Sequence, residues 1–240
     1  MLFRSALVIG PRLGFKRDPM RPHNMPLVLL GAGILWFGWF GFNGGSALTV
    51  GALASTAVIN TQIAASAAAI TWILTEKIRD GKATTLGIAS GAVAGMVAIT
   101  PACGFVNPFG ALIIGLLAGA TSAWAVSMKY KLGYDDSLDV VGVHGVSGFL
   151  GMLAIGFLGT VTANASGSNG FFAGGGFTLL SKQFIASITC GVFAFVVTFL
   201  IAKLIESSFG FRARAEEESN GLDQTYHAET AYDFSSISIR

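Results

Sequence analysis

Six apolar stretches, each close to the length of a membrane-spanning helix, dominate this 240-residue sequence and limit what it can fold into. A helix of about 20 apolar residues crosses the roughly 30 Å hydrocarbon core of a bilayer. Backbone N–H and C=O groups inside that core must be bonded within the protein, which favours α-helices. The predicted spans cover residues 25–46, 50–75, 83–100, 108–128, 139–159 and 184–205.

Composition supports a membrane protein and argues against several other classes. Hydrophobic residues make up 52% of the chain, charged residues only 12%, and glycine occurs 32 times. The net charge of +2 is too small to indicate a nucleic-acid partner. Cys103 and Cys190 are isolated and match no zinc or redox spacing. We expect an all-α, polytopic membrane helix bundle that is not an enzyme, with no catalytic residues, metal site or cofactor.

The loops between the spans differ in charge. Nearly all basic residues fall in alternate loops, which must lie on one side of the bilayer, whereas the other side has only Lys182. Cytoplasmic loops are enriched in Lys and Arg, so the basic side is predicted to be cytoplasmic. We therefore expect a multi-pass protein of the cell membrane with a cytoplasmic C-terminus. The basic set is Arg12, Lys16, Arg17, Arg21, Lys77, Arg79, Lys82, Lys129, Lys131, Lys203, Arg212 and Arg214.

One ionisable residue, His144, lies inside the fifth span. Charged side chains at the centre of a membrane helix cost about 2.5–3.5 kcal/mol on insertion scales, so such residues point to function. Asp135, Asp136 and Asp139 suit a helix N-terminus, where the helix dipole favours negative charge. Two interpretations of His144 stay open: a hydrogen-bonding tie between helices, or a side chain that lines a pore or relays protons.

Polar residues near the predicted outer ends of two spans form a second candidate site. Trp39 and Phe42 are three residues apart, and Ser46 follows by four, so they share a helix face. Two aromatic rings and a hydroxyl can hold a small cation through cation–π attraction and a hydrogen bond. The alternative is an interfacial aromatic belt. Thr100, before Pro101, is either a helix terminus or a pore position.

Small and polar residues within the spans predict close helix packing. Glycines at positions 142, 145, 148 and 151 give the fifth span a smooth face. The third and fourth spans each contain a Gly-x-x-x-Gly pattern, at residues 91–95 and 115–119. In the middle of the second span, Asn60, Thr61 and Gln62 are interpreted as hydrogen-bonding links between helices rather than as ligands.

Several segments together resemble one family. These are PHN at residues 22–24, GWFGFNGGS at 38–46, TPACGFV at 100–106 and DDSLDVVGVHGVSG at 135–148. They resemble the ammonium transporter family (Amt/Mep/Rh), and EEESNGLDQTYHAETAY at 216–232 is similar to the cytoplasmic tail of its bacterial-type members. The resemblance covers nearly the whole chain, in order.

The resemblance implies a fold and a mechanism. Family members have eleven spans, arranged as two inverted five-helix halves plus a final helix, and they assemble as trimers with one pore per subunit. Ammonium is recruited at an outer aromatic vestibule, deprotonated and passed along an apolar pore lined by two histidines. Ser46 then matches the vestibule serine, Phe42 an outer-gate phenylalanine and Trp39 a pore-lining tryptophan. His144 matches the second pore histidine, and Thr100 a threonine of the pore wall.

The six spans correspond to the second inverted half plus the final helix. We expect residues 1–24 to contain the end of a truncated preceding helix and a cytoplasmic loop. Residues 25–206 would form the membrane domain, and 207–240 the cytoplasmic tail. The predicted function is ammonium or ammonia transport by the parent protein, as a homotrimer in a lipid bilayer, with a PII-type signal protein at the cytoplasmic face. The alternatives are an ammonium sensor and a non-conducting fragment. The sequence leaves open which species crosses, NH3 or NH4+.

Overall fold

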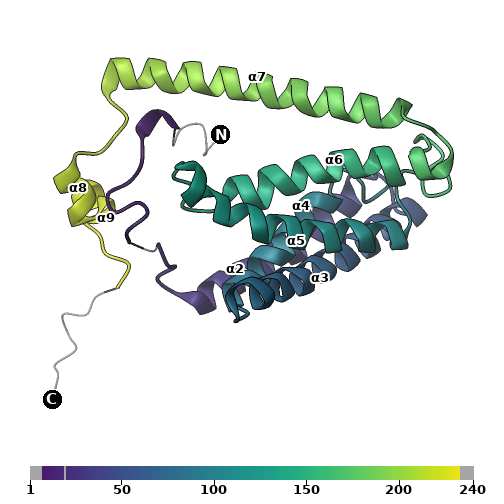
Figure 1. The fold of residues 1–240 in the computed structure, drawn as a ribbon, viewed down its shortest axis with the longest axis horizontal. Coiled ribbons are helices and arrows are strands. Elements are labelled where there is room, and N and C mark those ends of the chain that lie inside the picture. The colour runs from purple at the N-terminus through teal and green to yellow at the C-terminus, as the bar shows by residue number, and fades with distance from the viewer. Residues whose placement is uncertain (1–6, 19, 233–240) are drawn as a thin grey trace.

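The described part of the chain, residues 7–18 and 20–232 of the computed structural model, is helical and contains no strand (Figure 1). This confirms the all-α prediction. The apolar helices are α2 (Met25–Gly45), α3 (Ala52–Asp80), α4 (Thr85–Ile99), α5 (Pro108–Leu132), α6 (Ser147–Leu158) and α7 (Thr178–Phe209). A π-helix, η1 (Val141–Val146), leads directly into α6. The shorter elements are the 3₁₀-helix η2 (Phe171–Ala173), α8 (Ala215–Asn220) and α9 (Leu222–His227).

Five helical segments are long and apolar enough to cross a membrane, counting η1 and α6 as the single segment Val141–Leu158. With 15 residues, α4 is shorter than the others. The last apolar helix, α7, begins at Thr178 rather than at residue 184 and extends to Phe209. The expectation that the first ten residues end a preceding helix falls mostly on residues 1–6, which lie outside the described part.

Two helices continue through segments that were expected to be charged loops. α3 runs to Asp80 and ends at Gly81, and α5 runs to Leu132 and ends at Gly133. Both glycines adopt the left-handed conformation, with φ of 79° and 78°, which glycine tolerates best at a helix C-terminus. Basic residues in the last turn also interact favourably with the helix dipole. The expected boundaries at residues 75 and 128 were therefore too early.

The core forms where α4 and α5 both pack closely on α3. Gly95 of α4 and Gly115 of α5 approach the same peptide carbonyl, that of Ala64. A Cβ atom at either glycine would lie 2.4 Å from that oxygen, so neither position has room for a side chain. Ala64 and Ala68 are fully buried between the two neighbours. The Gly-x-x-x-Gly patterns thus serve close helix packing.

α2 and α7 lie at the periphery. In the 18-residue apolar stretch of each helix, no residue is buried. α7 packs along α6 and runs across one side of the bundle (Figure 1). The chain between them, after α6, folds back on itself, where Gly170 N donates to Gly159 O at 2.8 Å.

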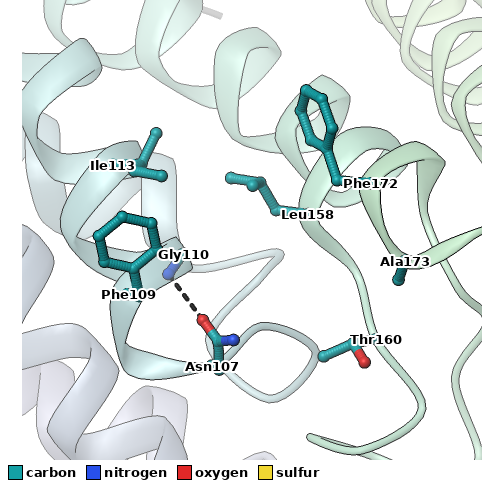
Figure 2. Close-up of a pocket in the computed structure, with 8 residues that line it drawn as sticks. All are labelled: Asn107, Phe109, Gly110, Ile113, Leu158, Thr160, Phe172 and Ala173. Carbon is teal, nitrogen blue, oxygen red and sulfur yellow. Dashed lines mark hydrogen bonds between the residues drawn. The ribbon is translucent and has the colours of Figure 1, made fainter.

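A pocket of about 400 Å³ lies between the start of α5, the end of α6 and η2 (Figure 2). Asn107 caps α5, since its side-chain oxygen accepts a hydrogen bond from Gly110 N at 2.8 Å. The pocket offers an apolar niche without an ionisable side chain. Its lining residues are Asn107, Phe109, Gly110, Ile113, Leu158, Thr160, Phe172 and Ala173.

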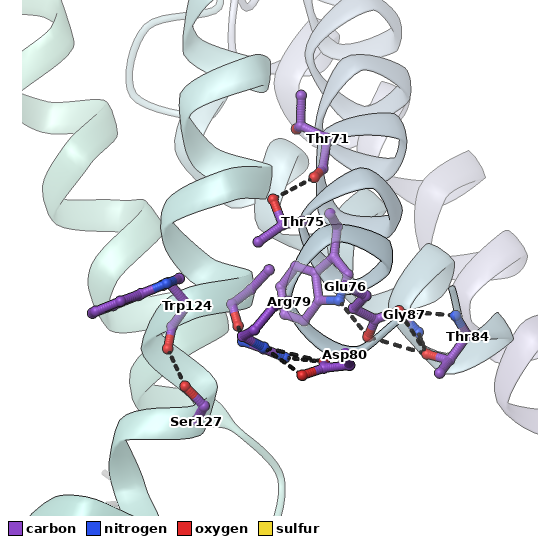
Figure 3. Close-up of polar contacts among 11 residues, drawn as sticks. Thr71, Thr75, Glu76, Arg79, Asp80, Thr84, Gly87, Trp124 and Ser127 are labelled. Atoms are coloured by element: carbon purple, nitrogen blue, oxygen red, sulfur yellow. Dashed lines mark hydrogen bonds and ion pairs between the residues drawn. The ribbon is translucent and has the colours of Figure 1, made fainter. Parts of the chain in front are cut away.

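Hydrogen bonds connect the C-terminal end of α3 to its neighbours (Figure 3). Glu76 accepts hydrogen bonds from Trp72 Nε1 at 3.0 Å and from Thr84 N at 2.9 Å, which closes the turn into α4. Arg79 Nη1 donates to Ala123 O of α5 at 2.6 Å. The last two turns of α3, expected to be a loop, therefore tie both neighbouring helices together.

The tail returns to the segment that precedes α2. Arg212 donates to Pro11 O at 2.7 Å and forms an ion pair with Glu218 at 2.9 Å. Glu218 also accepts a hydrogen bond from Leu13 N at 2.7 Å. The Tyr232 hydroxyl lies 3.0 Å from His23 Nδ1. These contacts join the tail to the segment before α2.

Candidate functional site

Trp39 is fixed in place by Thr100. The indole Nε1 of Trp39, on α2, donates to Thr100 Oγ1 at 2.8 Å. The Thr100 hydroxyl, at the end of α4, gives its own proton to Met96 O at 2.7 Å. Because that hydroxyl has a single proton, it accepts from the indole and holds the ring in one orientation. The structure therefore brings together two residues that the sequence analysis predicted separately.

Phe42 and Ser46 continue from Trp39 along the same side of α2. The Trp39 and Phe42 rings lie edge to face, with centroids 6.0 Å apart and an interplanar angle of 82°. Phe42 is 60% exposed, so its ring is open to a ligand. Ser46 is exposed as well, and its hydroxyl donates to Phe42 O at 2.7 Å. Its oxygen lone pairs can still accept a hydrogen bond.

Two residues next to the aromatic pair attach α2 to α3. Asn43 is 2% exposed, and its Nδ2 donates to Thr61 Oγ1 at 2.8 Å. Gly44 is also buried, and a Cβ atom there would lie 2.8 Å from the Val58 side chain. These two positions pack towards α3 and Trp39 contacts α4, so Trp39 is half-buried, whereas Phe42 and Ser46 stay exposed.

His144 lies in the π-helix η1, and its side chain is exposed. Val143 before it is 5% exposed and Ser147 after it is fully buried, whereas Gly145 is exposed. The imidazole makes no hydrogen bond to any residue in the described part of the chain. The ring therefore points away from the packed helices, and the interpretation as a tie within this bundle finds no partner among the described residues.

The five predicted site residues fall into two groups, on two elements that each pack against α4. Trp39, Phe42 and Thr100 form one connected group, with Ser46 a turn beyond Phe42. His144 lies on η1, which packs against α4 as α2 does. The described residues show no hydrogen bond or ring contact that joins His144 to the other four.

Two of the three polar residues in the middle of α3 link helices. Asn60 is fully buried, and its Nδ2 donates to Cys103 O and to Val106 O, each at 2.8 Å. It thereby holds the turn that follows Thr100. Thr61 accepts from Asn43 of α2. Gln62 differs, because it is exposed and donates to Ser66 of its own helix at 3.1 Å.

Sequence reasoning missed three features that support this site. It did not identify Asn43, the buried Lys129 or the π-helical form of η1. A polar residue directly after Phe42 was the available signal for Asn43. In the part of the chain that the structure describes, no group of three His, Cys, Asp or Glu side chains could hold a metal ion.

Comparison with known proteins identifies the family. The profile of the Ammonium Transporter Family matches residues 3–232. The chain belongs to the ammonium transporter family. It is 50% identical over 234 residues to the ammonium transporter of Mycobacterium tuberculosis (strain ATCC 25618 / H37Rv), covering 95% of this chain and 49% of that protein. The Bacillus subtilis (strain 168) ammonium transporter is 48% identical over 231 residues, covering 95% and 57%.

Solved structures agree with this family. Candida albicans Mep2 has a TM-score of 0.81 at 30% identity, covering 90% of this chain and 50% of that one. A protein described as a sensor Amt protein has a TM-score of 0.82 at 29% identity, covering 94% and 56%. The chain thus spans about half the length of the curated relatives it matches. It is a multi-pass membrane protein of a transporter family, not an enzyme family, as predicted.

Proposed function

We propose that this chain forms the C-terminal half of an ammonium transporter and supplies one wall of its pore. The observation that carries the proposal is the group on α2 in which a fixed, half-buried indole, an exposed phenyl ring and an exposed hydroxyl oxygen lie together. The match to about half of each relative supports the assignment to one half. The six apolar helices would be the second inverted half plus the final helix.

The outer group would recruit the cation. Because Trp39 has already given its N–H to Thr100, it presents a ring face rather than a donor to the ligand. A ring face attracts a cation by about 0.5–1 kcal/mol at an exposed site and by about 2 kcal/mol or more once water is excluded. The Ser46 oxygen would accept one N–H of ammonium. An acceptor and two aromatic rings suit a small cation and disfavour an anion.

His144 would act further along the path. A neutral imidazole offers one donor and one acceptor nitrogen, which suits the passage of ammonia or the relay of a proton through an apolar pore. Its exposure on the open side of η1 is what a pore-lining position requires. The remaining wall, including the other pore histidine, would come from the first half of the transporter. Without it, polar pore residues would face lipid, which is costly.

We further propose the setting in which this pore works. The protein would form a homotrimer in the cell membrane, with the basic end of the bundle and the tail in the cytoplasm, as the positive-inside rule favours. That end would be the surface for a PII-type signal protein. A second candidate function is ammonium sensing through the same surface, and one structural neighbour, at 29% identity, is described as a sensor Amt protein.

Methylammonium flux into liposomes tests the proposal. The chain would be reconstituted alone, with the N-terminal half of the Bacillus subtilis relative, and as a chimera in which it replaces the matching part of that relative. We expect no flux from the chain alone and saturable flux from the other two. In the chimera, His144→Ala should lower uptake about tenfold or more, because it removes the proton-exchanging group.

The matched control is His227→Ala, since His227 is exposed in the tail. Its uptake should equal that of the unmodified chimera. Saturable flux from the chain alone would contradict the assignment to one half of a pore. Unchanged uptake and pH dependence in His144→Ala would remove His144 from the mechanism.

A further inference from the structure

One face of α5 holds the segment that carries His144. Ser122, Val126 and Lys129 are spaced by four and three residues, so they lie in a row along this helix. Ser122 and Ser147 are both fully buried, and their hydroxyl oxygens lie 2.6 Å apart. Val126 packs so closely on Gly142 that a Cβ atom there would lie 2.6 Å from the valine side chain. Two contacts of the row thus bracket His144 along the chain.

Lys129 makes the third contact, at the start of η1. This lysine is only 8% exposed, and its Nζ donates to the backbone oxygen of Asp136 at 3.0 Å. It also forms an ion pair with the carboxylate of Asp139. The Asp136 carboxylate accepts hydrogen bonds from Val140 N at 2.9 Å and from Val141 N at 2.7 Å. Lys129 therefore secures the residue that caps the first turn before His144.

The backbone of Asp139 explains why the start of η1 requires a stabilising contact. Its φ of 56° lies in the left-handed region, which residues other than glycine adopt rarely and hold only when their surroundings impose it. The Asp139 carboxylate is partly buried, and its ion pair with the Lys129 ammonium compensates its charge. The lysine thus stabilises both the charge and the unusual backbone of Asp139.

The backbone at this point sets the direction of the His144 side chain. A π-helix carries an extra residue per turn relative to an α-helix, so it shifts the directions of the side chains within it. η1 begins two residues after Asp139 and ends where Ser147 meets Ser122. Between these anchors Val143 is buried and His144 is exposed. A change in register at either anchor would turn a different side chain outward.

We propose that Lys129 is a positioning residue for transport: it clamps the start of η1 on α5 so that His144 faces the open side. This inference rests on the proposed role of His144 in the pore. Lys129 itself is buried and contacts the polypeptide, not the substrate. Other titratable groups near the clamp are Asp135, which pairs with Arg12 at 2.7 Å, and Tyr134, a neutral phenol whose pKa is raised chiefly by burial.

The test compares three variants of the chimera. Lys129→Met removes the charge and the donor while keeping a similar volume, and Lys129→Arg restores a cationic donor. Lys131→Met is the matched control, because Lys131 is an exposed lysine on the same helix. Two measurements are made on each: the maximal rate and half-saturation concentration of methylammonium uptake, and amide hydrogen exchange in residues 140–147 relative to α4.

We expect Lys129→Met to lower the maximal rate about tenfold or more, since small misplacements of a reacting group have effects of that size. The half-saturation concentration should stay unchanged, because Trp39, Phe42 and Ser46 are untouched. Exchange in residues 140–147 should rise while α4 keeps its protection. Lys129→Arg should recover most of the maximal rate and most of the protection from exchange. Lys131→Met should keep a maximal rate within about twofold of the parent, since surface substitutions usually have small effects.

Unchanged exchange and unchanged maximal rate in Lys129→Met would overturn the proposal, as would a loss that Lys131→Met reproduces. If Lys129→Met does not accumulate in the membrane, Lys129→Gln replaces it in the same measurements. If the parent chimera does not transport, or His144→Ala has no effect, the proposed function fails instead. Hydrogen exchange in residues 140–147 then decides alone whether Lys129 clamps η1.

Discussion

The central helices and the segments that carry the candidate pore residues are held in different ways. α4 and α5 meet α3 through direct backbone contact at Gly95 and Gly115. α2 and η1 have close glycine contacts too, at Gly44 and Gly142, but they are held in addition by polar side-chain contacts, such as Asn43 with Thr61 and Lys129 with Asp139. Backbone contact fixes the distance between helices and leaves no room for a side chain. Polar contacts fix the direction of individual side chains, and each depends on one or two atoms.

The largest effect is expected from a substitution in the close-packed core. Gly95→Val would place side-chain atoms against the Ala64 carbonyl, and no rotamer relieves a clash at Cβ. Overpacking typically costs about 1–3 kcal/mol and occasionally more. We expect little or no monodisperse protein on size-exclusion chromatography in detergent.

The control for this variant is Gly191→Val on α7, where a Cβ atom has nothing within 4 Å. It should elute and melt as the unmodified protein does. If both valine variants behaved alike, close backbone contact would not distinguish the core from the periphery.

A smaller, graded effect is expected where α2 meets α3. Hydrogen bonds between membrane helices average about 0.6 kcal/mol and reach about 1.7 kcal/mol. Asn43→Ala and Thr61→Val should each lower the free energy of unfolding by about this amount while the core stays folded. Because both substitutions remove the same hydrogen bond, the double variant should lose less unfolding free energy than the sum of the two single losses. Unfolding in detergent measures all three, and strictly additive losses would show that the bond does not couple the helices.

The smallest effect concerns the tail, far from both regions. Hydrogen bonds from the Arg214 side chain lower the pKa of the Glu217 carboxyl from its usual 4.5 to about 2. Since the pKa is lowered in the folded tail, the stabilisation is present above pH 4.5 and is lost as the pH falls towards 2. A spin label at position 228, in a Cys190→Ser background, should become more mobile over that interval.

Glu217→Gln should show the mobile spectrum at all pH values, with uptake unchanged in the chimera. Glu216→Gln is the matched control, because Glu216 is an exposed neighbour, and it should keep the pH response. A response that persists in Glu217→Gln would assign the titration to another group.

The sequence predicted the helices more completely than it predicted what holds the site. The apolar stretches and the Gly-x-x-x-Gly patterns are local signals, and they predicted the all-α fold and the close packing. Charged residues misled the prediction at the ends of α3 and α5, where Gly81 and Gly133 were the better stop signals. The contact between Trp39 and Thr100 joins residues 61 positions apart, so no local pattern contains it.

The site residues themselves show a second limit. Physical reasoning from the sequence left two alternatives for each residue. Trp39 could belong to an aromatic belt or to a cation site, and His144 could form a hydrogen bond between helices or line a pore. The family resemblance singled out both for the pore, and their roles stay predictions. The π-helix was not predicted, because three aspartates before an apolar run also fit an ordinary α-helix N-terminus.

The shared contact at Ala64 makes α3 the common support of two helices. α4 and α5 both touch α3 at this peptide and again at Ala68, and they carry their candidate site residues at opposite ends of the bundle. Thr100, which holds Trp39, lies at the end of α4, and Lys129 lies near the end of α5. Because close contact at two successive turns of α3 leaves no room for either neighbour to shift, the end that holds Trp39 and the end that holds η1 keep a fixed separation.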